Sequence, residues 1–85
     1  MQIERVQTGV RIERRLLKVL KGLAEHLDMP LGELFEGVML HAFEGAQPFS
    51  PETRRKIEGL KAVYDLTLTA ADSHRLTEAR EASAE

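Results

Sequence analysis

The hydrophobic pattern of the chain changes at residue 13. Before that point, residues 6–12 (VQTGVRI) place an apolar or small side chain at every second position. A period of two with β-branched residues on one face is typical of a half-buried β-strand. A single strand leaves its backbone groups without partners, so we expect it to pair with the same strand of a second chain.

From residue 13 onward the apolar positions follow a helical period. Leucines at positions 16, 20, 23 and 27 predict an amphipathic helix over residues 13–28, with charges on the opposite face. Pro30 ends this helix and also suits the first turn of the next one, where its missing N–H costs nothing. The second helix, over residues 31–44, is apolar on more than one face. It therefore needs a second covering surface, which a partner chain would supply.

The remaining residues carry the start and stop signals of further helices. Gly45 is expected to close the second helix, and Ser50 followed by Pro51 predicts the start of a third helix over residues 51–65. Residues 66–68 are expected to be short and extended. Thr69 and Asp72 have the spacing of a capping box, which predicts a fourth helical segment over residues 70–80 before a frayed polar tail. We therefore divide the chain into a core, residues 1–45, and a helical extension, residues 46–85.

The length and the absence of cysteine favour a homodimer. A chain of 85 residues is short enough that disulfides, a metal or a partner subunit usually add to its stability. Without cysteine, disulfides and the common structural zinc sites are excluded, and we expect no cofactor. The same absence fits a reducing compartment, so we expect a cytoplasmic protein. No stretch reaches the roughly 18 apolar residues of a membrane span, and the first residues lack the apolar run of a signal peptide, which predicts a soluble, unprocessed chain.

The net charge of −2 hides a strong separation of charge along the chain. Residues 1–21 hold six basic and two acidic side chains, a balance of +4. Residues 22–45 hold five acidic side chains and neither lysine nor arginine. Because the local sign of charge decides where a polyanion can dock, the basic first quarter of the chain is the candidate DNA-binding region.

The order strand, helix, turn, helix over residues 5–45 resembles the ribbon-helix-helix family of DNA-binding proteins, which includes the Arc and methionine repressors. The likeness is strongest at the strand-to-helix step, Arg11-Ile12-Glu13-Arg14, and in the Leu-Ala-Glu run of the first helix. The resemblance implies a mostly α fold with one short β-strand, a ribbon-helix-helix dimer to which residues 46–85 add a helical extension. It also implies that two strands, one per chain, form an antiparallel ribbon in the major groove.

The resemblance assigns roles to particular residues. The outward positions of the strand, and hence the predicted base-reading residues, are Gln7, Gly9 and Arg11; glutamine suits adenine and arginine suits guanine. The residues predicted to contact DNA phosphates are Arg5, Arg14, Arg15 and Lys18. The residues predicted to form the dimer core are Val10, Ile12, Leu34, Phe35, Val38 and Phe43. The basic cluster at the start of the third helix, Arg54, Arg55 and Lys56, is interpreted as solvated surface.

Two classes of function remain open at this point. The first is a sequence-specific DNA-binding dimer, a transcriptional regulator that binds double-stranded DNA. The alternative is a protein-interaction module on the same dimer scaffold, including antitoxin-like binding of a partner through residues 46–85. An enzyme is not expected, because the sequence has no glycine-rich phosphate loop, no paired metal-ligand motif and no nucleophile elbow.

Overall fold

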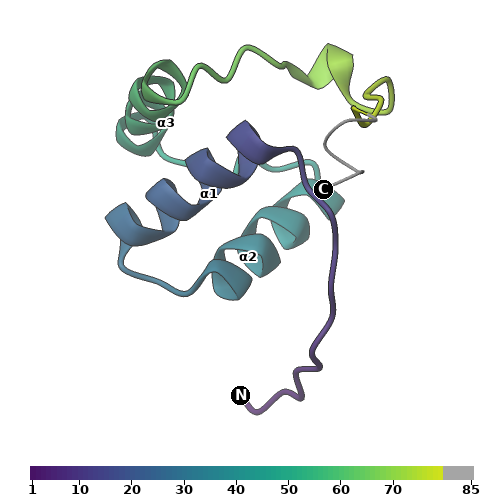
Figure 1. The fold of residues 1–85 in the computed structure, drawn as a ribbon. Helices are drawn as coiled ribbons and strands as arrows, with labels where there is room; N and C mark the ends of the chain where they lie inside the picture. Colours follow the sequence, from purple (N-terminus) through teal and green to yellow (C-terminus); the bar gives the residue numbers. More distant parts are fainter. Residues whose placement is uncertain (80–85) are drawn as a thin grey trace.

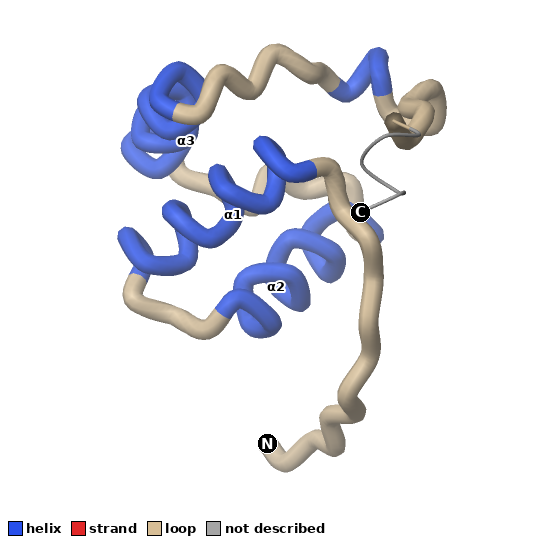
Figure 2. Tube along the Cα trace, viewed as in Figure 1, coloured by secondary structure: helices blue, strands red, loops and turns tan. Residues whose placement is uncertain are grey.

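The computed structural model describes residues 1–79 and contains three α-helices (Figure 1). They are α1 (Arg14–Leu27), α2 (Leu31–Phe43) and α3 (Pro51–Val63), and a short 3-10 turn, η1 (Ala70–Asp72), follows them. Helix α1 packs against both α2 and α3. The first thirteen residues leave the helices as an extended segment, the N-terminal arm (Figures 1 and 2). The helices therefore form the body of the protein, and the arm projects from it.

The predicted fold class is wrong in its β component. Residues 1–79 contain no β-strand, whereas a ribbon-helix-helix fold requires one in its ribbon (Figure 2). Residues 6–11, in the region expected to form that strand, are exposed, and Ile12 is half-buried. The physical reason is that an extended segment becomes a strand only when a neighbouring backbone accepts and donates its hydrogen bonds. No other described segment of the chain supplies such a neighbour.

The starts of the helices follow local capping signals. The Glu13 carboxylate accepts a hydrogen bond from the backbone N of Leu16 at 2.8 Å, which caps α1. Pro30 stands immediately before α2. At α3, Ser50 Oγ accepts a hydrogen bond from the backbone N of Thr53 at 3.2 Å. The predicted cap at Ser50 with a proline in the first helical position is thereby confirmed.

All three helices end in the same way, on a residue with left-handed backbone angles. These residues are Asp28 (φ 60°), Gly45 (φ 70°) and Asp65 (φ 56°). In each case the backbone N–H of the next residue donates to a carbonyl of the last helical turn, at 2.8–3.0 Å. This is the pattern of a Schellman motif, in which glycine is the residue with least strain. The prediction that Gly45 closes α2 is confirmed.

The core is small and centres on α1. Leu23, Ala24 and Leu34 form one buried cluster, and Val19 and Leu66 are also buried. The cluster joins α1 to α2, and Leu60 of α3 packs against it. Gly22 allows α3 to approach closely, since a Cβ at that position would lie 3.1 Å from Leu60 Cδ2. No residue of α3 is itself fully buried.

The predicted fourth helix is reduced to the single turn η1. Its capping box is present. Asp72 Oδ2 accepts a hydrogen bond from the backbone N of Thr69 at 2.8 Å, and Thr69 Oγ1 also donates to Asp72 Oδ2 at 3.3 Å. Residues 73–79 are not helical, and the prediction of a helix there is wrong; residues 80–85 lie outside the described part of the chain. The backbone of His74 is left-handed (φ 70°), which stops the helix. After η1, residues 73–79 offer no apolar stripe to hold a longer helix against the body.

None of the helices described over residues 1–79 is both long enough and apolar enough to cross a membrane. Within the same residues, histidine, aspartate and glutamate side chains nowhere gather in a group of three that could hold a metal ion.

Candidate nucleic-acid interface

The N-terminal arm presents its side chains to solvent along nearly its whole length. Residues 1–11 are all exposed, and Val6 and Val10 retain 80% and 71% of their possible accessible surface. Apart from Gly9 itself and its two chain neighbours, no described residue has an atom within 4 Å of where a Cβ at Gly9 would lie. The arm leads directly into the first turn of α1. Together they make up residues 1–21, which hold six basic and two acidic side chains and are here called the basic head.

The three predicted base-reading residues lie together on the arm, on open surface. Gln7 and Gly9 are exposed. Arg11 is also exposed and forms an ion pair with Glu78, from the segment that follows η1. The side chains of Arg11 and Glu78 keep 78% and 47% of their accessible surface, so solvent screens the pair. Arg11 can therefore leave this carboxylate for another anion at little cost.

Arg5 is held more precisely than Arg11. Its Nε and Nη2 donate to Oε2 and Oε1 of Glu36 on α2, each at 2.8 Å. This two-bonded geometry matches the planar guanidinium to the carboxylate. The hydrogen bonds from Arg5 lower the pKa of Glu36, and the same pair raises the pKa of Arg5. The contact attaches the arm to α2, yet both side chains remain partly exposed (60% and 41%).

The three α1 residues predicted to contact phosphates differ in their contacts with the body of the protein. Arg14 is exposed. Arg15 turns inward: its Nε donates to Glu13 Oε2 at 3.0 Å and its Nη1 to the carbonyl of Asp65 at 3.0 Å. Lys18 places its Nζ 5.9 Å from the centre of the Tyr64 ring. Arg15 and Lys18 thus connect the start of α1 to the end of α3, and Arg14 is the better placed for a phosphate.

The residues predicted to form a dimer core have different environments. Leu34 is buried in the core of its own chain (3% exposed), and Phe35, Val38 and Ile12 are half-buried. Phe43 and Val10 are exposed. Beside Phe43 (81%), α2 also exposes Met39 (47%) and Leu40 (62%). These three residues, Met39, Leu40 and Phe43, are here called the outer face of α2.

Sequence reasoning missed the residues that hold the basic side chains in place. Glu36 and Glu78 lie 31 and 67 positions from their arginine partners, and Asp65 lies 50 positions from Arg15. No local spacing rule reaches that far along a chain. The only signal in the sequence was the excess of acidic residues after residue 21, which indicated that partners for the head were available.

No protein family, curated protein or solved structure matches this chain. The resemblance of residues 5–45 to the ribbon-helix-helix family therefore gains no support from relatives, and the described residues lack the strand on which that fold depends. Function has to be inferred from the charges and exposed surfaces of the chain itself.

Proposed function

We propose that this protein is a homodimeric DNA-binding protein, a transcriptional regulator that docks its basic head on double-stranded DNA. One observation carries the proposal: an exposed, extended arm with Arg5 and Arg11 continues directly into the solvent-exposed Arg14 of α1. Extended basic arms are a known way for proteins to reach into a DNA groove. The acidic residues 22–45 repel the polyanion, so the head is the side that faces DNA.

The arm supplies contacts of two kinds in this proposal. Gln7 and Arg11 contact base edges, where the side-chain amide suits adenine and the guanidinium suits guanine. Gly9 between them lets the backbone approach the DNA closely, since it adds no side chain. Arg5, Arg14 and Lys18 contact phosphates, and Arg5 exchanges the Glu36 carboxylate for a phosphate oxygen. Such an exchange costs little because exposed ion pairs contribute little to stability.

A second copy of the chain is the proposed occupant of the outer face of α2. Only five residues of the described chain are buried, which is a thin core for a protein of this length. Meanwhile Leu40 and Phe43 expose most of their apolar surface. Packing two copies through this face removes that surface from water. It also presents two basic heads to one duplex, which raises affinity through effective concentration.

The test is the salt dependence of DNA binding, measured by fluorescence anisotropy on genomic fragments that include the gene's own promoter. Affinity should fall by orders of magnitude between about 50 and 200 mM salt, because phosphate contacts release counterions. Arg14→Ala should weaken binding to all sequences and reduce the slope of log affinity against log salt by about 0.9, the value for one neutralised phosphate. Arg11→Ala should cost about 1–3 kcal/mol on the preferred site and little on random DNA.

The matched control is Arg54→Ala, which removes the same charge from an exposed position on α3, outside the head. It should leave DNA affinity nearly unchanged. A flat salt dependence, or an equal loss in Arg54→Ala and Arg14→Ala, would contradict the proposal.

The interaction-module alternative keeps one observation in its favour. Arg5 and Arg11 already have carboxylate partners within the chain, while the outer face of α2 is exposed. If the protein binds no DNA, this face is the surface for a protein partner. The antitoxin-like version has less support, because α3 is folded against α1 through Leu60 and does not await a partner to form.

A further inference from the structure

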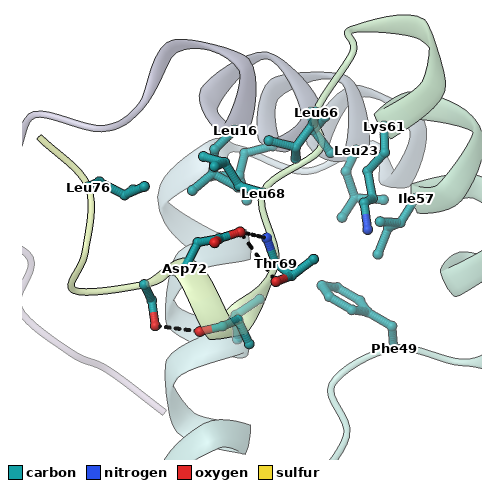
Figure 3. Close-up of a pocket in the computed structure, with 15 residues that line it drawn as sticks. Leu16, Leu23, Phe49, Ile57, Lys61, Leu66, Leu68, Thr69, Asp72 and Leu76 are labelled. Carbon is teal, nitrogen blue, oxygen red and sulfur yellow. Dashed lines mark hydrogen bonds between the residues drawn. The ribbon is translucent and has the colours of Figure 1, made fainter. Parts of the chain in front are cut away.

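A pocket of about 510 Å³ lies between α1, α3 and the segment of residues 66–76. Figure 3 shows Leu16 and Leu23 of α1 along the upper side with Leu68 beside Leu16, Thr69 and Asp72 below them, and Phe49 at the lower right. The volume falls in the range of sites that bind small molecules, about 300–1,000 Å³. The proposed DNA-binding function makes no use of this space.

The walls of the pocket are mostly apolar and include residues of the buried core. Val19 and Leu23, which are 4% and 2% exposed, belong to its lining. Leu66 and Leu68 close it from the side of residues 66–76. A cavity with such walls gains little from water, whose hydrogen bonds the leucines cannot satisfy, and it favours an aliphatic occupant.

The polar groups around the pocket differ in the hydrogen bonds and ion pairs that they already form. Asp72 accepts two hydrogen bonds from Thr69, and Ser73 Oγ donates to the carbonyl of Ala70 at 2.8 Å. Lys61 is the cation among the described residues that line the pocket, and its side chain is 30% exposed. Its Nζ lies 3.5 Å from the carboxylate of Glu58, whose side chain is 73% exposed.

The two charges lie at different ends of the pocket. In Figure 3 Lys61 descends beside Ile57, with its Nζ on the α3 side, while the Asp72 carboxylate turns toward Thr69. An anionic group is therefore favoured at the α3 end and disfavoured near η1. The exposed Glu58 carboxylate is weakly held. It competes poorly for the Lys61 ammonium with an anion whose apolar part also packs in the pocket.

We propose that this pocket binds an amphiphilic carboxylate, with its aliphatic chain among the leucines of α1 and residues 66–76 and its carboxylate on Lys61 Nζ. The apolar lining selects the chain, and the single lysine of the lining selects a negative head group. This inference does not depend on DNA binding.

The first experiment measures binding of hexanoate, octanoate and decanoate to the full chain by isothermal titration calorimetry, below their micelle concentrations. Each added CH₂ should tighten binding by roughly fourfold as it enters the pocket. Decyltrimethylammonium, with the same chain and a positive head, should bind more weakly than decanoate. Absence of decanoate binding to the folded protein, or affinity that does not change with chain length, would overturn the proposal.

The second experiment uses matched variants. Lys61→Met keeps the length of the side chain but removes its charge, and it should weaken decanoate binding by about tenfold while leaving decanol binding unchanged. Lys56→Met, on an exposed position of α3 that does not line the pocket, should bind decanoate as the parent does. Equal decanoate affinity in Lys61→Met and the parent would overturn the assignment of the head group.

A third variant fills the space. Ala70→Trp places a large side chain at a lining position that is exposed, so the fold should persist, as circular dichroism can verify. It should abolish decanoate binding and leave the sedimentation behaviour of the protein unchanged. If Ala70→Trp instead disrupts self-association and the unsubstituted protein binds no decanoate, a second copy of the chain occupies the pocket and the proposal is wrong.

Discussion

Helices α1 and α2 are neighbours of nearly equal length, 14 and 13 residues, yet they are buried in opposite ways. Helix α1 mixes charges with leucines and buries Val19, Leu23 and Ala24. Helix α2 is much the more apolar of the two and buries only Leu34. Apolar composition alone therefore does not decide how much of a helix is buried.

The arrangement of the helices explains the difference. Helix α1 contacts both α2 and α3, so its apolar stripe is covered from two sides. Among the described helices, α2 packs on α1 alone, so its other apolar residues have no cover within this part of the chain. One helix thus holds the chain together, and the other offers the surface on which we propose a second copy packs. Substitutions in each helix test this division.

The largest effect is expected from Leu23→Ala in α1. Leu23 is 2% exposed at the centre of the core, and truncating a fully buried leucine costs about 2–5 kcal/mol through lost burial and a residual cavity. The free energy of unfolding, measured by urea titration at fixed protein concentration, should fall by that amount. Met39→Ala on α2 is the matched control. If both variants are monomeric and Met39→Ala lowers the free energy of unfolding as much as Leu23→Ala does, the proposed difference between α1 and α2 is contradicted.

The double variant Leu40→Ser/Phe43→Ser should act on association and leave the fold of the chain intact. Both side chains are exposed in the single chain, so their loss creates no cavity there. Truncating two large apolar residues at an interface centre should weaken the dimer by roughly a hundredfold or more, as sedimentation equilibrium would show. Val63→Ser, exposed on α3, should leave the dimer unchanged. If the unsubstituted protein is monomeric at micromolar concentration, the proposal of a dimer is contradicted.

The two helix ends should respond in opposite directions to substitution. Gly45 after α2 and Asp28 after α1 both have left-handed backbone angles. Gly45→Ala should lower the free energy of unfolding by about 1 kcal/mol, because a Cβ strains that conformation. Asp28→Gly should raise it by a few tenths to about 1 kcal/mol, since it relieves strain and removes a negative charge from a helix C-terminus. Thermal melts would show both shifts, and changes of the same sign would refute this explanation of the helix ends.

The smallest effect is expected from Glu36→Gln on the polar flank of α2. It removes the carboxylate that holds Arg5, so the arm should detach from α2 and DNA affinity should rise roughly two- to fivefold. Glu33→Gln, one turn earlier on α2, removes the same charge without breaking a hydrogen bond to Arg5 and is the control. A fall in DNA affinity in Glu36→Gln would show that this contact positions the arm for binding.

Acid should mimic that variant. Because Arg5 lowers the pKa of Glu36, the pair is fully formed above the ordinary glutamate pKa and is lost as the pH falls through the lowered value. NMR signals of Arg5 Nε should report the release of the arm in that range. A signal that does not change with pH would mean that Glu36 does not hold the arm in solution.

The amino-acid sequence by itself determined the features that depend on a few neighbouring residues. The caps at Ser50 and Gly45, the break at Pro30 and the capping box at Thr69 all form between groups at most five positions apart. The helix bounds of α1, α2 and α3 therefore fall within two residues of their predicted places. The division of charge between the head and residues 22–45 is likewise a property of the sequence alone.

The tertiary structure decided everything that needs a distant partner. The alternation of residues 6–12 predicted a β-strand, and that prediction was wrong. A strand forms only beside a second backbone, and none of the described residues supplies one. Leu34 and Phe43 occupy the same apolar helix, but only the position of α1 determines that Leu34 is buried and Phe43 exposed. The contacts of Arg5 with Glu36 and of Lys18 with Tyr64 arise only when the helices pack, because those residues are brought within reach by the fold and not by their spacing along the chain.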